Sequence, residues 1–301
     1  MIGCVTLSAN DYFEVRLSIP LTVIGAGRVG KTLARCLHRQ ALVTMIDVVT
    51  QGSASAQAAA AFIGAGTARW HGKDLADATI FMLAVPDDQI VLCCEQLVAA
   101  GKLGPHSVVF HCSGALPSSI LLAATSAGAV VASLHPIRSF AQPAHVADQF
   151  AGTYCGIEGD VAALAVLSPL FEAMGAVLVP LQGASKTLYH AAAVFASNYV
   201  VTLMATAHDA YIAAGIPADV ALKLLTPLTR ETVDNVARLG PLNALTGPIA
   251  RGDVDTVARQ QEAVSAWECQ RGLLYHHLAN ATRSLVAAPS IDATVVPIHT
   301  S

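Results

Sequence analysis

Short, uninterrupted apolar runs recur along the first part of the chain, and stretches of helical periodicity separate most of them. The runs lack the alternation of apolar and polar residues that a half-exposed strand shows. They therefore predict strands buried on both faces, as in a parallel sheet. We expect strands at residues 21–24, 43–49, 79–85, 107–110, 130–134, 153–157 and 176–180. Strands that alternate with helices predict a doubly wound α/β sheet.

The pattern changes at Lys186, because no further strand is evident before the C-terminal tail. The segment Lys186–Ala214 predicts one long helix, which ends at Gly215 because glycine readily adopts the left-handed conformation that closes a helix. Further helices are expected over Ala218–Leu239 and residues 253–285. We expect an N-terminal extension (1–19), a sheet domain (20–182), an all-helical domain (183–288) and a C-terminal tail (289–301).

A glycine-rich turn follows the first predicted strand and opens a helix. It reads Gly25-Ala26-Gly27-Arg28-Val29-Gly30, the pattern G-x-G-x-x-G. In such a turn the first glycine permits the tight bend, the second lets a pyrophosphate approach the backbone, and the third lets the helix pack on the strand. The free N–H groups and the positive end of the helix dipole then face the phosphates. The position between strand and helix predicts a Rossmann-type dinucleotide-binding domain; the alternative is a glycine-rich turn without a ligand.

The end of the second predicted strand bears on the choice of cofactor. An acidic residue there binds the ribose hydroxyls of NAD, whereas small polar or basic residues suit the 2′-phosphate of NADP. Asp47 has about the expected spacing, but the strand continues beyond it and ends at Thr50, Gln51 and Ser53. We therefore expect all six residues of the turn together with Thr50, Gln51 and Ser53 to bind NADP, with NAD as the alternative and Asp47 as an ordinary strand residue.

Polar side chains stand where three other predicted strands end, and ligands of doubly wound sheets bind at the carboxyl ends of strands. We expect cofactor contacts from Val85, Pro86, His111 and Ser113, and a substrate contact from His135. Each histidine has an alternative role, in which its ring bonds to a nearby backbone carbonyl. A metal site built from His111, His135 and His190 is a weaker alternative, since the three lie on separate elements without a local spacing pattern. We predict no metal.

Composition changes the picture in one respect. Of the 301 residues, 54% are hydrophobic and 13% are charged. The segment 187–208 contains no Asp, Glu, Lys or Arg, and it is long enough to cross a bilayer. This segment carries histidines, threonines and an asparagine, and its apolar residues are largely alanine and valine. We therefore expect a helix buried in a protein core rather than a membrane span. Its apolar surface also predicts a homodimer through the helical domain.

Charge and cysteine content exclude other classes of protein. The net charge of -4 without a basic block does not favour nucleic acid as a partner. Seven cysteines without a C-x-x-C pattern favour reduced thiols and a cytoplasmic location.

Four segments resemble a known family: residues 111–115 (HCSGA), 134–136 (LHP), 186–192 (KTLYHAA) and 245–253 (LTGPIARGD). They look like Rossmann-like proteins whose C-terminal half is a domain of unknown function. That family is similar to the β-hydroxyacid dehydrogenase superfamily, which includes ketopantoate reductase and pyrroline-5-carboxylate reductase. The resemblance covers roughly Leu21 to Ala287. The superfamily has a lysine at the start of the first long helix of its second domain, which Lys186 matches. It has an asparagine four residues later, where this chain has His190.

The resemblance implies hydride transfer, in which a carbonyl oxygen also gains a proton. Lys186, if burial lowers its pKa, and His190, one helical turn later, are the candidate catalytic residues. Ser197 and Asn198 are weaker candidates for substrate contacts. Lys186 is alternatively a solvated residue at a helix start, and His190 a satisfied core histidine. We predict an oxidoreductase, with NADP favoured, that acts on a small carbonyl, hydroxy-acid or imine compound. The alternative is a non-catalytic nucleotide-binding sensor that kept the cofactor site.

Overall fold

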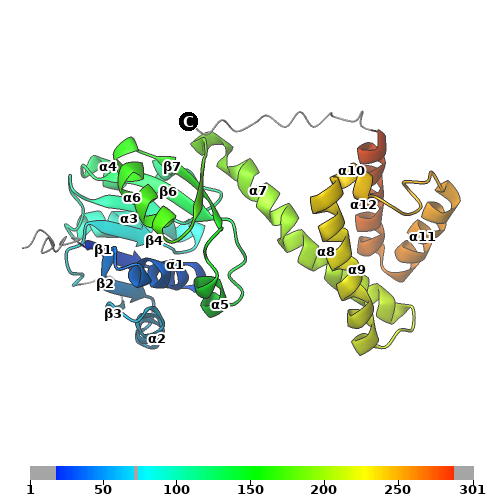
Figure 1. Ribbon diagram of the computed structural model, residues 1–301, viewed down its shortest axis with the longest axis horizontal. Coiled ribbons are helices and arrows are strands. Elements are labelled where there is room, and N and C mark those ends of the chain that lie inside the picture. Colours follow the sequence, from blue (N-terminus) through cyan, green and yellow to red (C-terminus); the bar gives the residue numbers. More distant parts are fainter. Residues whose placement is uncertain (1–17, 71–73, 288–301) are drawn as a thin grey trace, which may run out of the picture. The chain divides into compact units, whose positions relative to one another are not determined.

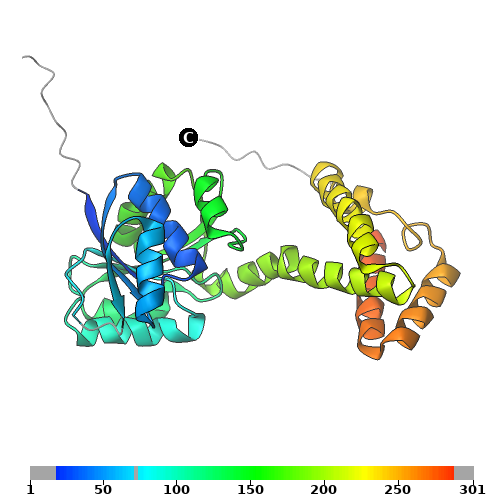
Figure 2. The same cartoon turned by 90° about the horizontal axis from the view of Figure 1, so that it is seen from below.

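The computed structural model describes residues 18–70 and 74–287 (Figures 1 and 2). The chain divides into two compact units, the first ending at Ser197 and the second beginning at Asn198. The predicted boundary at Gln182–Gly183 lies earlier, so the first helix after the sheet is part of the first unit. The expected N-terminal extension, apart from its last two residues, and the expected C-terminal tail lie outside the described residues.

The first unit is built on one eight-stranded sheet with the strand order β3-β2-β1-β4-β5-β6-β7-β8. The six strands from β3 to β6 in this order run parallel, β7 is antiparallel to β6, and β8 is parallel to β7. The strands are β1 (Ile19–Ile24), β2 (Val43–Thr50), β3 (Thr67–Trp70), β4 (Ile80–Leu83), β5 (Val108–His111), β6 (Val130–Pro136), β7 (Tyr154–Gly159) and β8 (Val177–Pro180). This mostly parallel α/β sheet confirms the predicted fold class.

Helices cover both faces of the sheet and explain why its strands read as unbroken apolar runs. One core cluster lies under α1, α2, α5 and α6, and a second lies under α3 and α4. Alternate residues of β4 enter the two clusters: Ile80 and Met82 the first, Phe81 and Leu83 the second. These helices are α1 (Arg28–Arg39), α2 (Ser53–Ile63), α3 (Ile90–Ala99), α4 (Leu122–Ser126), α5 (Pro143–Asp148) and α6 (Val161–Ala173).

Two features of the sheet differ from the prediction. The edge strand β3 was not expected, because its four residues are exposed or half-buried and form no apolar run. The last two strands were expected to be parallel to the others, but they are reversed. Parallel neighbours need a crossover of a dozen or more residues, usually a helix that returns along the sheet. The connection between β6 and β7, residues 137–153, contains one short helix, the six residues of α5, which is about 9 Å long. This helix is too short to return along the sheet, and β7 begins at the edge where β6 ends, with Cys155 paired to Pro136.

The helical part confirms the predicted change of period, with one break that was not predicted. The expected helix over Lys186–Ala214 is divided into α7 (Lys186–Ala196) and α8 (Asn198–Ala213). At Ser197, between them, the backbone leaves the helical region (φ -129°, ψ -67°), and the Ser197 hydroxyl donates to the Ala193 carbonyl at 2.8 Å. The remaining helices are α9 (Ala218–Leu239), α10 (Pro241–Ala244), α11 (Val254–Trp267) and α12 (Cys269–Ala287).

The apolar segment that raised the question of a membrane lies in α7 and α8. Gly183–Ala213 is long and apolar enough to cross a bilayer, with a mean hydropathy of 1.3, and none of its most apolar window is buried within the chain. The expectation of a helix buried in the core of a single chain is therefore wrong. Length and composition alone are weak evidence for a membrane span, since the core helix of a soluble protein passes the same test. The cytoplasmic location stays a prediction.

Candidate functional site

The glycine turn between β1 and α1 is closely packed at two of its glycines and open at the third. A β-carbon on Gly25, whose φ is +88°, would lie 2.6 Å from the Ala84 carbonyl group, and one on Gly30 would lie 2.3 Å from the Gly25 carbonyl oxygen. A β-carbon on Gly27 would have no atom within 4 Å. Helix α1 begins at Arg28 with no acidic residue in its first turn and no side-chain cap. An open backbone at a helix N-terminus suits an anion such as the pyrophosphate of a dinucleotide.

The end of β2 carries hydroxyl groups rather than a carboxylate. The Thr50 hydroxyl lies 2.6 Å from that of Ser55 and donates to the Gly52 carbonyl at 2.9 Å. Asp47 lies inside the strand, 1% exposed. Its carboxylate accepts from Arg69 Nε at 3.0 Å and from the Ala76 N–H at 2.8 Å. Both oxygens of Asp47 are thus used within the protein, in agreement with its interpretation as an ordinary strand residue.

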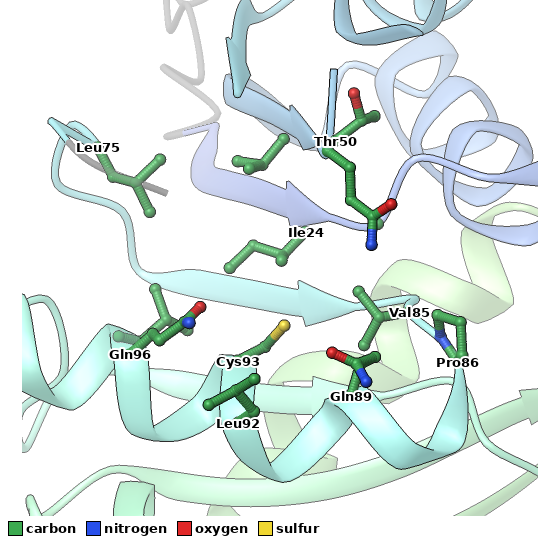
Figure 3. A pocket seen from close by; sticks show the side chains of 13 residues that line it. Ile24, Thr50, Leu75, Val85, Pro86, Gln89, Leu92, Cys93 and Gln96 are labelled. Carbon is green, nitrogen blue, oxygen red and sulfur yellow. The ribbon is translucent and has the colours of Figure 1, made fainter. Parts of the chain in front are cut away.

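A cavity of about 510 Å³ opens beside the turn (Figure 3). Among the predicted cofactor residues, Gly25, Thr50, Gln51, Val85 and Pro86 line it, whereas the rest of the turn, Ser53, His111 and Ser113 do not. Residues of α3 and the residue directly before it form the opposite wall and were not predicted, because strand ends alone were considered: Gln89, Leu92, Cys93, Gln96 and Leu97. Figure 3 shows Cys93 on this helix facing the strand ends that carry Ile24 and Thr50.

His111 is the buried last residue of β5, and its ring bonds to the loop that follows. Its side chain has no exposed surface; Nδ1 accepts from the Ser113 N–H at 3.2 Å, and Nε2 lies 3.2 Å from the Pro117 carbonyl. Burial lowers the pKa of His111 to about 4, so the ring is neutral with its proton on Nε2. The predicted cofactor contact from this ring is not supported by its position. Its two bonds hold the loop, which is the alternative role considered for it.

Ser113 and Asp87 connect the same loop to the end of β4. The Ser113 hydroxyl donates to Asp87 Oδ2 at 2.9 Å and accepts from the N–H groups of Ala115 and Leu116, each at 3.1 Å. Asp87 makes no side-chain cap bond to the helical segment that follows β4. Ser113 is only 7% exposed, and its hydroxyl forms its hydrogen bonds within the protein, where it holds the loop in place.

Lys186 is fully buried at the start of α7. Its ammonium group donates to the Ser113 carbonyl at 2.8 Å and to the Ser133 hydroxyl, and it lies 3.9 Å from Glu158 Oε1. Glu158, which was not predicted, also accepts from the N–H and the hydroxyl of Ser118, both at 2.7 Å. Burial lowers the pKa of Lys186 to about 8. Because the ammonium has no exposed surface, it cannot reach a substrate in this conformation, and the alternative of a solvated lysine is excluded as well.

His135 and His190 come together against Gly114. Their ring centroids are 5.4 Å apart in an edge-to-face arrangement. A β-carbon on Gly114 would lie 2.4 Å from Nδ1 of His190 and 2.8 Å from Nε2 of His135, so only glycine lets both rings pack there. Nδ1 of His190 is buried without a hydrogen-bond partner. A buried nitrogen without a partner indicates a place for a ligand or a water molecule.

The remaining predicted residues lie farther along the chain. Ser197 and Asn198 stand at the junction of α7 and α8, about two helical turns after His190, and their substrate role stays a prediction. Within residues 18–70 and 74–287, no three His, Cys, Asp or Glu side chains gather in a way that could hold a metal ion.

Comparison with known families assigns the two parts of the chain to domain families. Residues 6–136 match a Rossmann-like domain, and residues 153–282 match a domain of unknown function, DUF2520. The chain is therefore a Rossmann-like protein that carries a C-terminal DUF2520 domain. It has no significant match among curated proteins.

Solved structures show the same fold over most of the chain. Protein BF3122 from Bacteroides fragilis, provisionally described as an NADP oxidoreductase, is 21% identical, with a TM-score of 0.73; the match covers 89% of this chain and 98% of that one. Protein TM1727 from Thermotoga maritima is 25% identical over the same shares, with a TM-score of 0.68. Pyrroline carboxylate reductase from Plasmodium falciparum, solved with NADP bound, is 12% identical over the same shares, with a TM-score of 0.56. The chain thus has a distant structural similarity to NAD(P)-dependent oxidoreductases.

Proposed function

We propose that the protein is an NADP-dependent oxidoreductase that transfers a hydride between the cofactor and a small carbonyl, hydroxy-acid or imine compound. The observation that carries this proposal is the turn after β1, enclosed at Gly25 and Gly30 and open at Gly27. NADP is favoured over NAD because the only acid on β2, Asp47, is occupied by Arg69 and Ala76.

The roles of the side chains follow from their exposure. When bound, the nicotinamide supplies or accepts the hydride. His190 is the proposed acid: in its cationic form it gives a proton to the substrate oxygen and becomes neutral, and solvent restores the proton. Lys186 is proposed to act as a positioning residue, because its bonds to Ser113 and Ser133 join α7 to the ends of β5 and β6. Ser197 and Asn198 remain proposed substrate contacts.

The test is a titration of the full chain with NADPH and, in parallel, NADH, followed by nicotinamide fluorescence. We expect micromolar binding of NADPH and an affinity for NADH weaker by about tenfold or more, which is about 1.4 kcal/mol. A screen of carbonyl and imine compounds then measures NADPH oxidation. If neither NADPH nor NADH binds, the proposal is refuted.

A second candidate function is a nucleotide-binding sensor without catalysis. The burial of Lys186, whose ammonium is occupied by protein acceptors, favours it. The two proposals differ in one measurement. Tight NADPH binding without oxidation of the cofactor by any compound in the screen would support the sensor, whereas turnover of one compound at an ordinary enzymatic rate would exclude it.

A further inference from the structure

A tyrosine of α7 contacts His135 and is not used by the function proposed above. The hydroxyl of Tyr189 lies 3.1 Å from Nδ1 of His135, and the two rings meet edge to face with centroids 5.6 Å apart. Tyr189 directly precedes His190 on the helix, so two consecutive rings of α7 contact the His135 ring. The contact joins the first turns of α7 to the carboxyl end of β6.

Glycine on the neighbouring strand makes room for this contact. Gly156 of β7 is the antiparallel partner of His135 on β6. A β-carbon on Gly156 would lie 2.5 Å from the Tyr189 hydroxyl oxygen. With any larger residue at 156, the hydroxyl would have to move away from its place beside His135. The tyrosine contact is therefore built by three elements: α7, β6 and β7.

The ionisation of the two rings determines which way the hydrogen bond runs. Burial raises the pKa of Tyr189 to about 12, so the phenol keeps its proton. Burial, together with the nearby His190 and the Lys186 ammonium, lowers the pKa of His135 to about 4, so its ring is neutral. A phenol is the stronger donor and a neutral imidazole nitrogen the stronger acceptor. The hydroxyl therefore donates to Nδ1, and a neutral histidine that accepts at Nδ1 carries its proton on Nε2.

We infer that Tyr189 is a positioning residue that fixes His135 as the neutral Nε2–H tautomer, so that His135 offers a hydrogen bond to an acceptor oxygen of the substrate. A neutral donor holds its proton through the reaction, and the proton that the oxygen gains comes from His190, as proposed above. The part that concerns the substrate rests on the proposed function. The tautomer itself does not, because it is a property of the free protein.

The test is the imidazole nitrogen spectrum of the full chain labelled with 15N-histidine. The resonances of His135 are assigned by their loss in His135→Gln. In the wild-type protein we expect an unprotonated Nδ1 and a protonated Nε2 that stay unchanged between about pH 6 and 8. Tyr189→Phe removes the donor, and we expect a mixture of both tautomers. Gly156→Ala should give the same change by displacing the hydroxyl while both partners of the bond are kept.

The control is Tyr154→Phe, since Tyr154 lies on the same strand β7 but is 56% exposed. It should leave the His135 spectrum unchanged. A proton on Nδ1 of His135 in the wild-type protein, or an unaltered spectrum in both Tyr189→Phe and Gly156→Ala, would overturn the inference. NADPH titration of the same variants separates this result from a failure of the proposed function, because the tautomer is measured without cofactor.

Discussion

At the scale of single residues, Lys186 is a cation that the fold keeps away from water. Its pKa is lowered from an ordinary value of 10.5 to about 8, chiefly by burial, so between these two pH values the unfolded chain binds more protons than the folded one. The free energy of unfolding therefore rises with pH across this window, by about 3 kcal/mol for one such group. Below pH 8 the full cost of burying the charge is present.

Lys186→Met should remove this dependence. We expect the unfolding free energy of the wild-type protein, relative to the variant, to rise between pH 7.5 and pH 10, measured by guanidinium denaturation. Lys102→Met is the matched control, because Lys102 bonds to the exposed Asp77 at the surface. Parallel curves for the wild-type protein and Lys186→Met over this pH range would contradict the prediction.

The types of the site residues could be read from the sequence, but their surroundings could not. Lys186 and His190 were singled out by spacing and resemblance, and Asp47 was rightly set aside as a strand residue. The sequence could not show that Lys186 points inward to Ser113, since its acceptors lie far away along the chain. Glu158 was missed for the same reason, because a single acid inside a strand has no local pattern.

At the scale of elements, two glycines of the turn between β1 and α1 should affect different properties, one the stability of the protein and the other its affinity for the cofactor. Gly30→Ala would place a β-carbon 2.3 Å from the Gly25 carbonyl oxygen, so it should destabilise the protein by about 1–3 kcal/mol, as overpacking does. Gly27→Ala has open space at a backbone φ of -68°, so thermal unfolding should be nearly unchanged. NADPH affinity should nevertheless fall by about tenfold or more, because the methyl group would occupy the proposed position of the pyrophosphate. An unchanged affinity in Gly27→Ala would count against cofactor binding at this turn.

The residues at the end of β2 suggest a substitution that should reverse the proposed preference for NADP over NAD. Gln51 is exposed and lines the cavity. Gln51→Asp places a carboxylate where it would repel a 2′-phosphate and accept from ribose hydroxyls. The ratio of NADPH to NADH affinity should fall by about tenfold or more in fluorescence titrations, whereas Gln51→Asn should keep the wild-type ratio. An equal loss of both affinities in Gln51→Asp would place the 2′-phosphate elsewhere.

Elements were predictable where their signal is local. Buried strands with apolar runs, such as β1 and β4, were placed correctly, as was α9. The exposed strand β3 has no such run, and the direction of β7 depends on how the chain returns from β6, which a sequence pattern does not encode. The break between α7 and α8 falls at Ser197, in a stretch without the glycine or proline that commonly ends a helix.

At the scale of the whole molecule, the helices α7 and α8 have large apolar side chains that the rest of the chain does not cover. Leu188 on α7 is 78% exposed and Val201 on α8 is 69% exposed. Large exposed apolar patches on proteins mark interaction surfaces, and a second copy of the chain is the partner we propose.

Light scattering at micromolar concentration should therefore give twice the chain mass of 31.1 kDa. Leu188→Lys and Val201→Lys should each shift the mass toward that of one chain, while Val161→Lys, at an 84% exposed position on α6, should not. A wild-type protein of one chain mass would refute the dimer, and recovery only from detergent-extracted membranes would instead assign Gly183–Ala213 to a bilayer.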